Sequence, residues 1–523
     1  MTFISYLNNK KNYAIFFLLY LASNFFMILN VDGKYWDDWW ILGVEQSILD
    51  QVFYHLDGDA GAVRARMIGF LSQVGNGVLV FRILTFMLYF GVVLSVFKIL
   101  QTISALSKED VFFVTLIFML APLNSAKALA VSVFPYAVSL FIFFIGFYLL
   151  SRNLSSNNIF IRFFILILFF ASFLTNSLLV FYAVPLIHLF YQKYHNQSNT
   201  FFNNFRVFIK QNLDFVFLPI VFFAVRLIFF KPSGLNYDYN SFDWHMILSM
   251  PITILISFYS SFLEPISQSF STFIPFWIFG LLVFLLPFGD KSANLTGNKK
   301  HYLRFLLLGC LFFVLAVFPY LAVSKLPQLG DFASRHQLLI PLGFAFILYF
   351  FIKFFAASVG AKNQLTTQVL WIFILAFTAQ TIYINYQYKL DWFYQVGLEE
   401  HIKDMDIFEK NTTFVVDMEH DLLQLRHIMN EGEHSHRLKK IFGNEKRLMM
   451  DKSEVEKVLN NSEKSLASAS KSWVYSEQEP VYIRITKGRL HRKIFFYEFF
   501  DQEKFKFFAK KLIYVEQVNK NPN

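Results

Sequence analysis

Two adjacent carboxylates near the N-terminus are the residues of this chain best suited to chemistry. Asp37 and Asp38 lie within the sequence YWDDWW of residues 35–40, a few residues after an apolar run over 12–30 that is long enough to cross a bilayer. A carboxylate at an apolar interface is poorly hydrated, which raises its pKa and makes it a better proton acceptor near neutral pH. Either aspartate could be a general base, while its neighbour orients a metal ion or a substrate. The alternative is a solvated loop whose aromatic rings anchor the helix end at the membrane surface.

Arg335 and His336 form a second candidate site, where the chain enters a late apolar run. A guanidinium is well shaped for phosphate oxygens, so Arg335 is a candidate for binding a phosphate group. The alternative is a salt bridge from Arg335 to Asp331 or to the first loop. His336 could donate a proton or a hydrogen bond.

Arg64 and Arg66 lie in the long connection 41–77, just before an apolar stretch. The pattern around residues 60–77 suits an amphipathic helix on the membrane surface, in which the two arginines meet lipid phosphates. Ordinary interfacial positions for both side chains are the alternative.

The composition indicates a polytopic membrane protein. The 523 residues are 55% hydrophobic and 16% charged, with a mean hydropathy of +0.44, which is too apolar for a soluble protein of this size. The net charge of +10 does not indicate nucleic-acid binding, because the basic residues are scattered among short loops and a mixed-charge tail. Cys310 is the only cysteine, which excludes disulfides within the chain and cysteine-based zinc sites.

Apolar runs of spanning length predict a mainly α-helical transmembrane bundle of about eleven spans. The expected helices lie near residues 12–30, 78–100, 110–124, 133–151, 159–175, 177–193, 213–230, 272–288, 302–323, 337–355 and 367–386. The stretch 245–270 is ambiguous, because it is apolar but holds two prolines and Glu264. Leaving it out puts most basic loops on the side of Lys10 and Lys11, which the positive-inside rule makes the cytoplasm. The predicted topology has the N-terminus inside and the C-terminus outside.

The chain is expected to fold as two parts. Residues 1–389 would form the transmembrane domain, with a first outer loop over 31–77, and 390–523 would form a soluble extracytoplasmic α/β domain. Within this second part, residues 412–417 and 481–485 predict strands. The stretch 418–464 between them is expected to be helical and polar.

Four histidines gather in the tail, at positions 420, 427, 434 and 436. Only His434 and His436 are close in sequence, and a pair two residues apart in an expected loop is weak evidence for a metal site. A solvated, pH-responsive surface is the preferred interpretation.

In this layout the chain resembles the membrane-embedded glycosyltransferases of the GT-C class. The features that carry the resemblance are the acidic pair Asp37-Asp38 after the first span, the amphipathic segment near 60–77, the many spans, and the outer soluble domain. The segment Ser334-Arg335-His336 is similar to a late basic motif of several GT-C families, and the YWDDW sequence is similar to the acidic motif of GtrII-like bacterial O-antigen glucosyltransferases.

The resemblance implies a hexosyltransferase-like enzyme of the inner (cytoplasmic) membrane that makes cell-envelope polysaccharide. It would move a sugar from a polyprenyl-phosphate donor to a glycan or lipid acceptor on the outer face. Asp37 would be the base, Asp38 would orient the acceptor or a divalent metal, and Arg335 would stabilise the departing phosphate. A transporter or flippase of lipid-linked sugars and a non-catalytic envelope assembly protein remain as alternatives.

Overall fold

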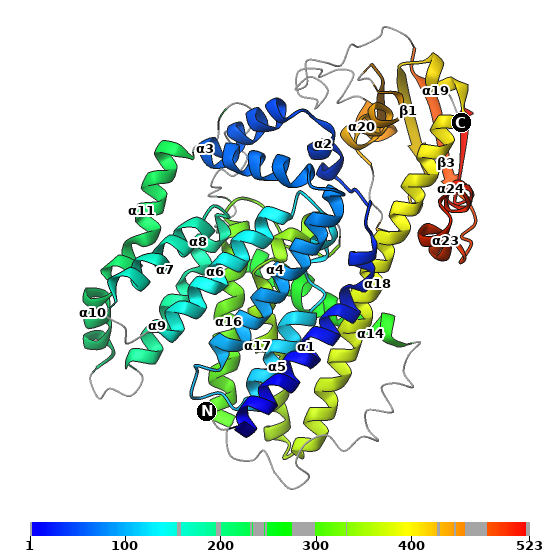
Figure 1. Ribbon diagram of the computed structural model, residues 1–523. Coiled ribbons are helices and arrows are strands. Elements are labelled where there is room, and N and C mark those ends of the chain that lie inside the picture. The colour runs from blue at the N-terminus through cyan, green and yellow to red at the C-terminus, as the bar shows by residue number, and fades with distance from the viewer. Residues whose placement is uncertain are drawn as a thin grey trace.

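The computed structural model shows an α-helical bundle with a small α/β unit at one end (Figure 1). The described residues are 3–153, 158–194, 200–230, 233, 245, 248–274, 299–330, 332–425, 429–443, 446–455 and 479–518.

Six helices of the described chain are long and apolar enough to cross a membrane, which suggests a membrane protein. They are α1 (Phe3–Leu29), α4 (Gly77–Leu100), α6 (Phe134–Arg152), α16 (Lys299–Leu321), α17 (Ile340–Ser358) and α18 (Asn363–Asp404). A seventh span is possible if α10 (Phe201–Gln211) and α11 (Leu213–Phe229), bent by 65°, count as one. The predicted number of about eleven is not confirmed.

Three of the expected spans form helices that are too short to cross a bilayer alone. They are α5 (Lys108–Leu120), α7 (Ile159–Ser172) and the broken pair α8 (Ser177–Phe181) and α9 (Ala183–Tyr194). Helix α5 ends just before Pro122, and α9 begins just before Pro185, as expected where proline removes a backbone donor. The expected span at 272–288 lies almost entirely outside the described residues.

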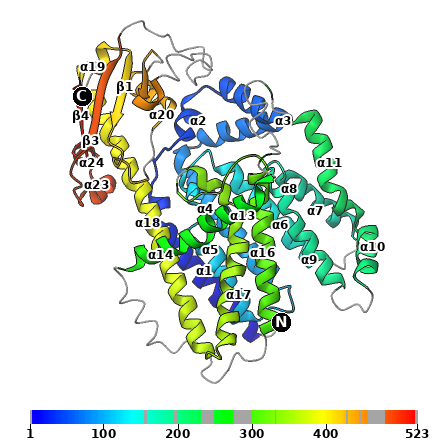
Figure 2. The same cartoon turned by 180° about the vertical axis from the view of Figure 1, so that it is seen from behind.

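Around the ambiguous stretch 245–270, residues 250–273 are helical, with a π-helical turn in the middle. The segments are α13 (Met250–Phe258), the π-helical η3 (Tyr259–Leu263) and α14 (Glu264–Phe273). None of them is among the helices that could cross a membrane, in agreement with leaving this stretch out. Figure 2 shows α13 and α14 lying across the bundle in front of the long helices.

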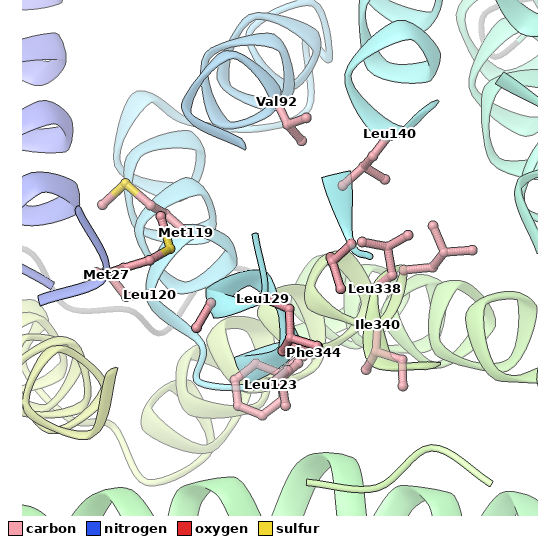
Figure 3. Packing of buried hydrophobic residues seen from close by; sticks show 14 of the residues in the cluster. Met27, Val92, Met119, Leu120, Leu123, Leu129, Leu140, Leu338, Ile340 and Phe344 are labelled. Atoms are coloured by element: carbon pink, nitrogen blue, oxygen red, sulfur yellow. The ribbon is translucent and has the colours of Figure 1, made fainter. Parts of the chain in front are cut away.

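The core of the bundle is built around α5. Its Val114, Leu116 and Ile117 are fully buried, and its neighbours α1, α4, α17 and α18 surround it. Figure 3 shows how aliphatic side chains from several of these helices meet beside the segment that follows α5. This segment contains the 3-10 helix η1 (Ser125–Ala128) and leads into α6.

Two helices follow the first span at the same end of the bundle. Helix α2 (Asp37–Gly43) carries the acidic pair, and α3 (Gln46–Ser72) occupies the expected amphipathic region. Helix α3 turns sharply at Asp57 and Gly58, and the positive φ of 58° at Gly58 favours glycine there. The 3-10 helix η5 (Phe332–Gln337) lies against η1.

The C-terminal part contains a four-stranded mixed sheet of order β2-β1-β3-β4. The strands are β1 (Thr413–Met418), β2 (Leu448–Asp451), β3 (Val481–Lys487) and β4 (Ile513–Val518), and the helices are α19 (Asp406–Lys410), α20 (Glu431–Phe442), η6 (Lys452–Glu454), α23 (Ile494–Phe500) and α24 (Gln502–Lys510). The strands predicted at 412–417 and 481–485 are confirmed. The helical prediction for 418–464 is partly wrong, because it contains the buried strand β2 as well as α20.

The expected domain boundary at 389–390 falls inside one continuous helix. Helix α18 has 42 residues, or about 63 Å at 1.5 Å per residue, roughly twice the thickness of a bilayer core. Its second half leaves the bundle and supports the sheet (Figure 1). The first-loop helix α2 packs on α20, so the acidic pair and the C-terminal unit share one end of the molecule.

This contact can be tested by a designed disulfide between Gly43 and His436. A Cβ atom built on Gly43 lies 3.7 Å from the Cβ of His436, within the range of about 3.5–4.5 Å found in disulfides. We expect Gly43→Cys with His436→Cys, in a Cys310→Ser chain, to become cross-linked on mild oxidation in membranes. Non-reducing electrophoresis after thiol labelling measures this. Gly43→Cys with His420→Cys should stay reduced, and equal behaviour of the two pairs would contradict the docking.

Candidate functional site

Asp38 is fully buried and is bound by the backbone of a distant segment. Its carboxylate accepts hydrogen bonds from the amides of Ala130 (2.9 Å), Val131 (2.9 Å) and Ser132 (3.0 Å), and from the Ser132 hydroxyl (3.1 Å). Three successive amides pointing at one anion form a strong charge-assisted cradle. Asp38 therefore fixes α2 to the segment between η1 and α6.

Arg82 makes a second connection between the same two segments. It lies in α4, is buried, and donates to the carbonyl oxygens of Gly33 (2.6 Å) and Ala128. One anion and one cation thus join the first loop to the chain around η1, each with backbone partners. The loop that carries the acidic pair is held on both sides of Trp36.

Trp36 has an unusual backbone conformation, with φ of 52°. Its amide donates to a carboxylate oxygen of Glu433 in α20 (2.9 Å), and its ring stacks on Phe332 of η5. Glu433 also closes a capping box with Asn430 at the start of α20. A strained residue directly before an acidic pair, held from two other elements, is typical of a functional site.

Asp37 differs from Asp38 in its burial and in its hydrogen-bond partners. It is partly buried, and no described residue makes a hydrogen bond or ion pair with its carboxylate. Burial raises the pKa of Asp37 to about 6, the charges of Asp38 and Glu433 add to the rise, and the guanidinium of Arg335 opposes it. The side chain is therefore a free proton acceptor near neutral pH.

Arg335 lies on the same side of the site as Asp37. Its guanidinium carbon is 3.5 Å from the centre of the Phe332 ring, and it donates to the Phe332 carbonyl (2.9 Å). Since Phe332 also stacks on Trp36, the aromatic ring connects the arginine to the acidic loop. The alternative partner Asp331 lies outside the described residues.

Two lysines add positive charge near η5. Burial and then the charge of Arg335 lower the pKa of Lys325 to about 8, and burial lowers the pKa of Lys127 in η1 to about 8. Ser334 connects the two turns, because its hydroxyl accepts from the Ala126 amide (2.8 Å). Three cations, Arg335, Lys325 and Lys127, therefore lie in or near these two turns.

His336 is placed as a neutral ring. Burial, followed by the charges of Arg335 and Lys325, lowers its pKa to about 3. Its ring lies 5.3 Å from that of Tyr320, centre to centre. The structure thus favours a hydrogen-bonding role for His336 over that of a proton donor.

The structure does not bring Arg64 and Arg66 to the acidic pair. Arg64 forms a 3.0 Å ion pair with Asp57, and Arg66 lies 3.9 Å from Asp50, both within α3. The helix predicted there exists. A role for these arginines with lipid phosphates stays a prediction.

The surroundings of Asp38 do not suit the divalent metal considered for this residue. Both carboxylate oxygens already accept hydrogen bonds from the backbone, and a cation would have to displace amide donors. Within the described ranges, no cluster of three or more histidine, cysteine, aspartate or glutamate side chains could hold a metal ion. We therefore assign no step to a metal.

The interpretation of the tail histidines as a solvated surface is wrong for two of them. His434 and His436 are buried in α20, where the helix packs on α2, while His420 is exposed and His427 lies outside the described residues. A capping box between Asn430 and Glu433 begins α20, so His434 and His436 lie in a helix and not in the expected loop.

Three residues of the site were not predicted as such: Arg82, Glu433 and Lys127. A lone arginine inside an apolar span is a usable signal for Arg82, because such charges face the protein interior. No local pattern distinguishes Glu433 or Lys127 from other charged residues. The sequence matches no protein-family model, and no curated protein matches it significantly.

The two aspartates should respond oppositely to neutralisation. Asp38→Asn leaves buried amides without a charged acceptor, which should cost about 3 kcal/mol and lower the melting temperature. Above pH 6 the Asp37 carboxylate is charged in the folded state, although burial disfavours that charge. Asp37→Asn removes this cost, so the melting temperature at pH 7.5 should stay the same or rise. Thermal unfolding of the purified variants measures this. Equal losses in both would contradict the division of roles.

Proposed function

We propose that the protein is an integral-membrane glycosyltransferase that moves a sugar from a polyprenyl-phosphate donor to a glycan or lipid acceptor. The observation that carries the proposal is the unpaired, partly buried carboxylate of Asp37, at one end of a helical bundle and beside Arg335. A base poised near neutral pH next to a cation suits proton removal coupled to departure of a phosphate.

In the proposed reaction, Asp37 accepts the proton of an acceptor hydroxyl. The hydroxyl oxygen bonds to the anomeric carbon of the donor sugar as the bond from that carbon to the phosphate oxygen breaks. The leaving group is the polyprenyl phosphate, whose charge Arg335 stabilises. Lys325 and Lys127 contribute further positive charge to the same turns.

Asp38 is a positioning residue in this proposal. Its carboxylate is committed to the amides of residues 130–132, so it orients α2 and thereby the neighbouring Asp37. His336 contributes a neutral hydrogen-bonding ring beside Arg335.

The proposed setting is the inner membrane, with the N-terminus cytoplasmic and this site on the outer face. About eleven spans, as the basic loops favour, give the odd number that this topology needs. The common end shared by α2 and the C-terminal unit supports a single outer compartment for both.

The decisive test is Asp37→Asn, which keeps the shape of the side chain but removes its proton acceptor. We expect turnover of a polyprenyl-phosphate sugar by protein in detergent to fall about a hundredfold or more, in the range that removal of a general base costs. Membrane abundance should not change.

The pH dependence gives a second readout of the same prediction. Turnover of the unchanged protein should rise with pH through about 6, as Asp37 loses its proton, and then level off. This limb should disappear in the residual activity of Asp37→Asn. Full activity of the variant at normal abundance would overturn the proposal and favour an anchoring loop.

A further inference from the structure

A cavity of about 280 Å³ lies between α2 and α20. We call it the lysine pocket. Lys34, Trp39 and Gly43 line it from the first loop, and His436, Lys439 and Lys440 line it from α20. Its size is close to the lower limit for small-molecule sites, enough for one sugar-sized compound.

Positive charge in the lysine pocket exceeds the negative charge. Lys440 pairs with Glu399 (2.8 Å), and Lys439 donates to the carbonyl of Gly43 (2.8 Å). Lys34 has no hydrogen-bond or ion-pair partner in the described part of the chain. Burial, and then the charge of Lys440, lowers the pKa of Lys34, while the charges of Glu399, Asp38 and Asp32 partly oppose this. A partly buried ammonium without a direct ion pair is costly, and an anion bound beside Lys34 would offset that cost.

Trp39 gives the pocket a rigid aromatic wall. Its indole nitrogen donates to Gln395 (2.9 Å), which fixes the ring, and the ammonium groups of Lys34 and Lys440 each lie 5.5 Å from the ring centre. Arg437 also lies 4.7 Å from the ring centre. An aromatic ring beside several cations suits a ligand that has both an apolar sugar face and a charged group.

We propose that the lysine pocket binds an anionic sugar through its phosphate or carboxylate group. Gly43, which lines the pocket, ends the seven-residue helix that Asp37 begins, so it lies about 10 Å along the axis of α2 from Asp37. One glycan chain can span that distance. The assignment of this anionic sugar to the acceptor rests on the proposed function.

The test is direct protection of Lys34 from acylation, which needs no turnover. Full-length protein in nanodiscs is treated with an amine-reactive ester at pH 8 and constant ionic strength, and modification of each lysine is measured by mass spectrometry. Inorganic phosphate or glucuronate, at ten times its dissociation constant, should slow the reaction at Lys34 about tenfold, whereas glucose should not. Lys440→Gln should weaken this protection.

The arms of the experiment separate the possible sources of the anion. Protection by phosphate alone identifies a phosphorylated sugar, and protection by glucuronate alone identifies a uronic acid. The exposed Lys362 serves as the control. No protection by either anion, or equal protection of Lys362, would overturn the pocket without bearing on Asp37, whose role is tested by turnover.

A second, independent observation concerns the exposed phenylalanines of α23 and α24. Large exposed fractions are found at Phe496 (59%), Phe499 (49%), Phe500 (72%) and Phe507 (54%). Such a patch on a polar α/β unit calls for a covering surface.

The position of α23 indicates what covers it. Phe495 packs on Phe26 of α1 and stacks on Tyr386 of α18, both in membrane-crossing helices. Lys389 donates to the carbonyl of Leu29, the last residue of α1, and pairs with Glu498 of α23. Helix α23 is therefore held level with the C-terminal end of α1, beside α18 (Figure 2).

We infer that α23 inserts its exposed phenylalanines into the lipid surface. Exposed basic residues that suit anionic headgroups come directly before them: Arg489, Arg492 and Lys493. Aromatic side chains next to exposed basic ones are typical of a helix that lies in the membrane interface.

A fluorophore attached at Phe500→Cys, in a Cys310→Ser chain in nanodiscs, tests this insertion. We expect blue-shifted emission and quenching by lipids brominated on their acyl chains. The same label at Gln517→Cys, exposed on β4, should show neither. An unquenched label at Phe500→Cys would overturn the inference. This outcome includes a blue-shifted but unquenched label, which would mean that a protein and not lipid covers the patch.

Discussion

The rest of the site depends on the hydrogen bonds that three successive amides donate to the Asp38 carboxylate. It joins residues 92 to 94 positions apart and is entirely buried, so its charge-assisted hydrogen bonds are not weakened by water. With Arg82 bridging Gly33 and Ala128, the first loop cannot move without breaking buried polar contacts. This rigidity places Asp37 without using Asp37 for any structural contact.

The second half of α18 explains why the C-terminal unit is part of the site and not a separate module. Four polar side chains along this helix bind other parts of the chain. Lys389 pairs with Glu498, and Glu399 pairs with Lys440. Asp391 accepts from the amides of Gln424 and Leu425, and Gln395 accepts from Trp39 and Arg437. Each contact is at least partly buried and therefore specific in geometry. These contacts fix the positions of α20 and α23 along α18 and therefore relative to the bundle.

The sequence predicts the class of fold well and the site in part. Several of the apolar runs and two of the strands are local patterns, and these form helices and strands where expected. The division of labour between Asp37 and Asp38 could not be predicted, because adjacent aspartates look identical until distant amides select one of them. The predicted number of spans is not confirmed among the described residues, because hydropathy alone does not detect breaks such as that near Pro185.

Backbone strain at Trp36 connects these observations. A φ of 52° in a bulky residue costs of order 1–3 kcal/mol, and it persists here because Glu433 binds the amide and Phe332 covers the ring. Those two residues come from the C-terminal unit and from η5, which also carries Arg335. The conformation that presents Asp37 therefore requires the assembled end of the bundle, so that the proposed base is correctly placed only when the proposed phosphate-binding arginine is in place as well.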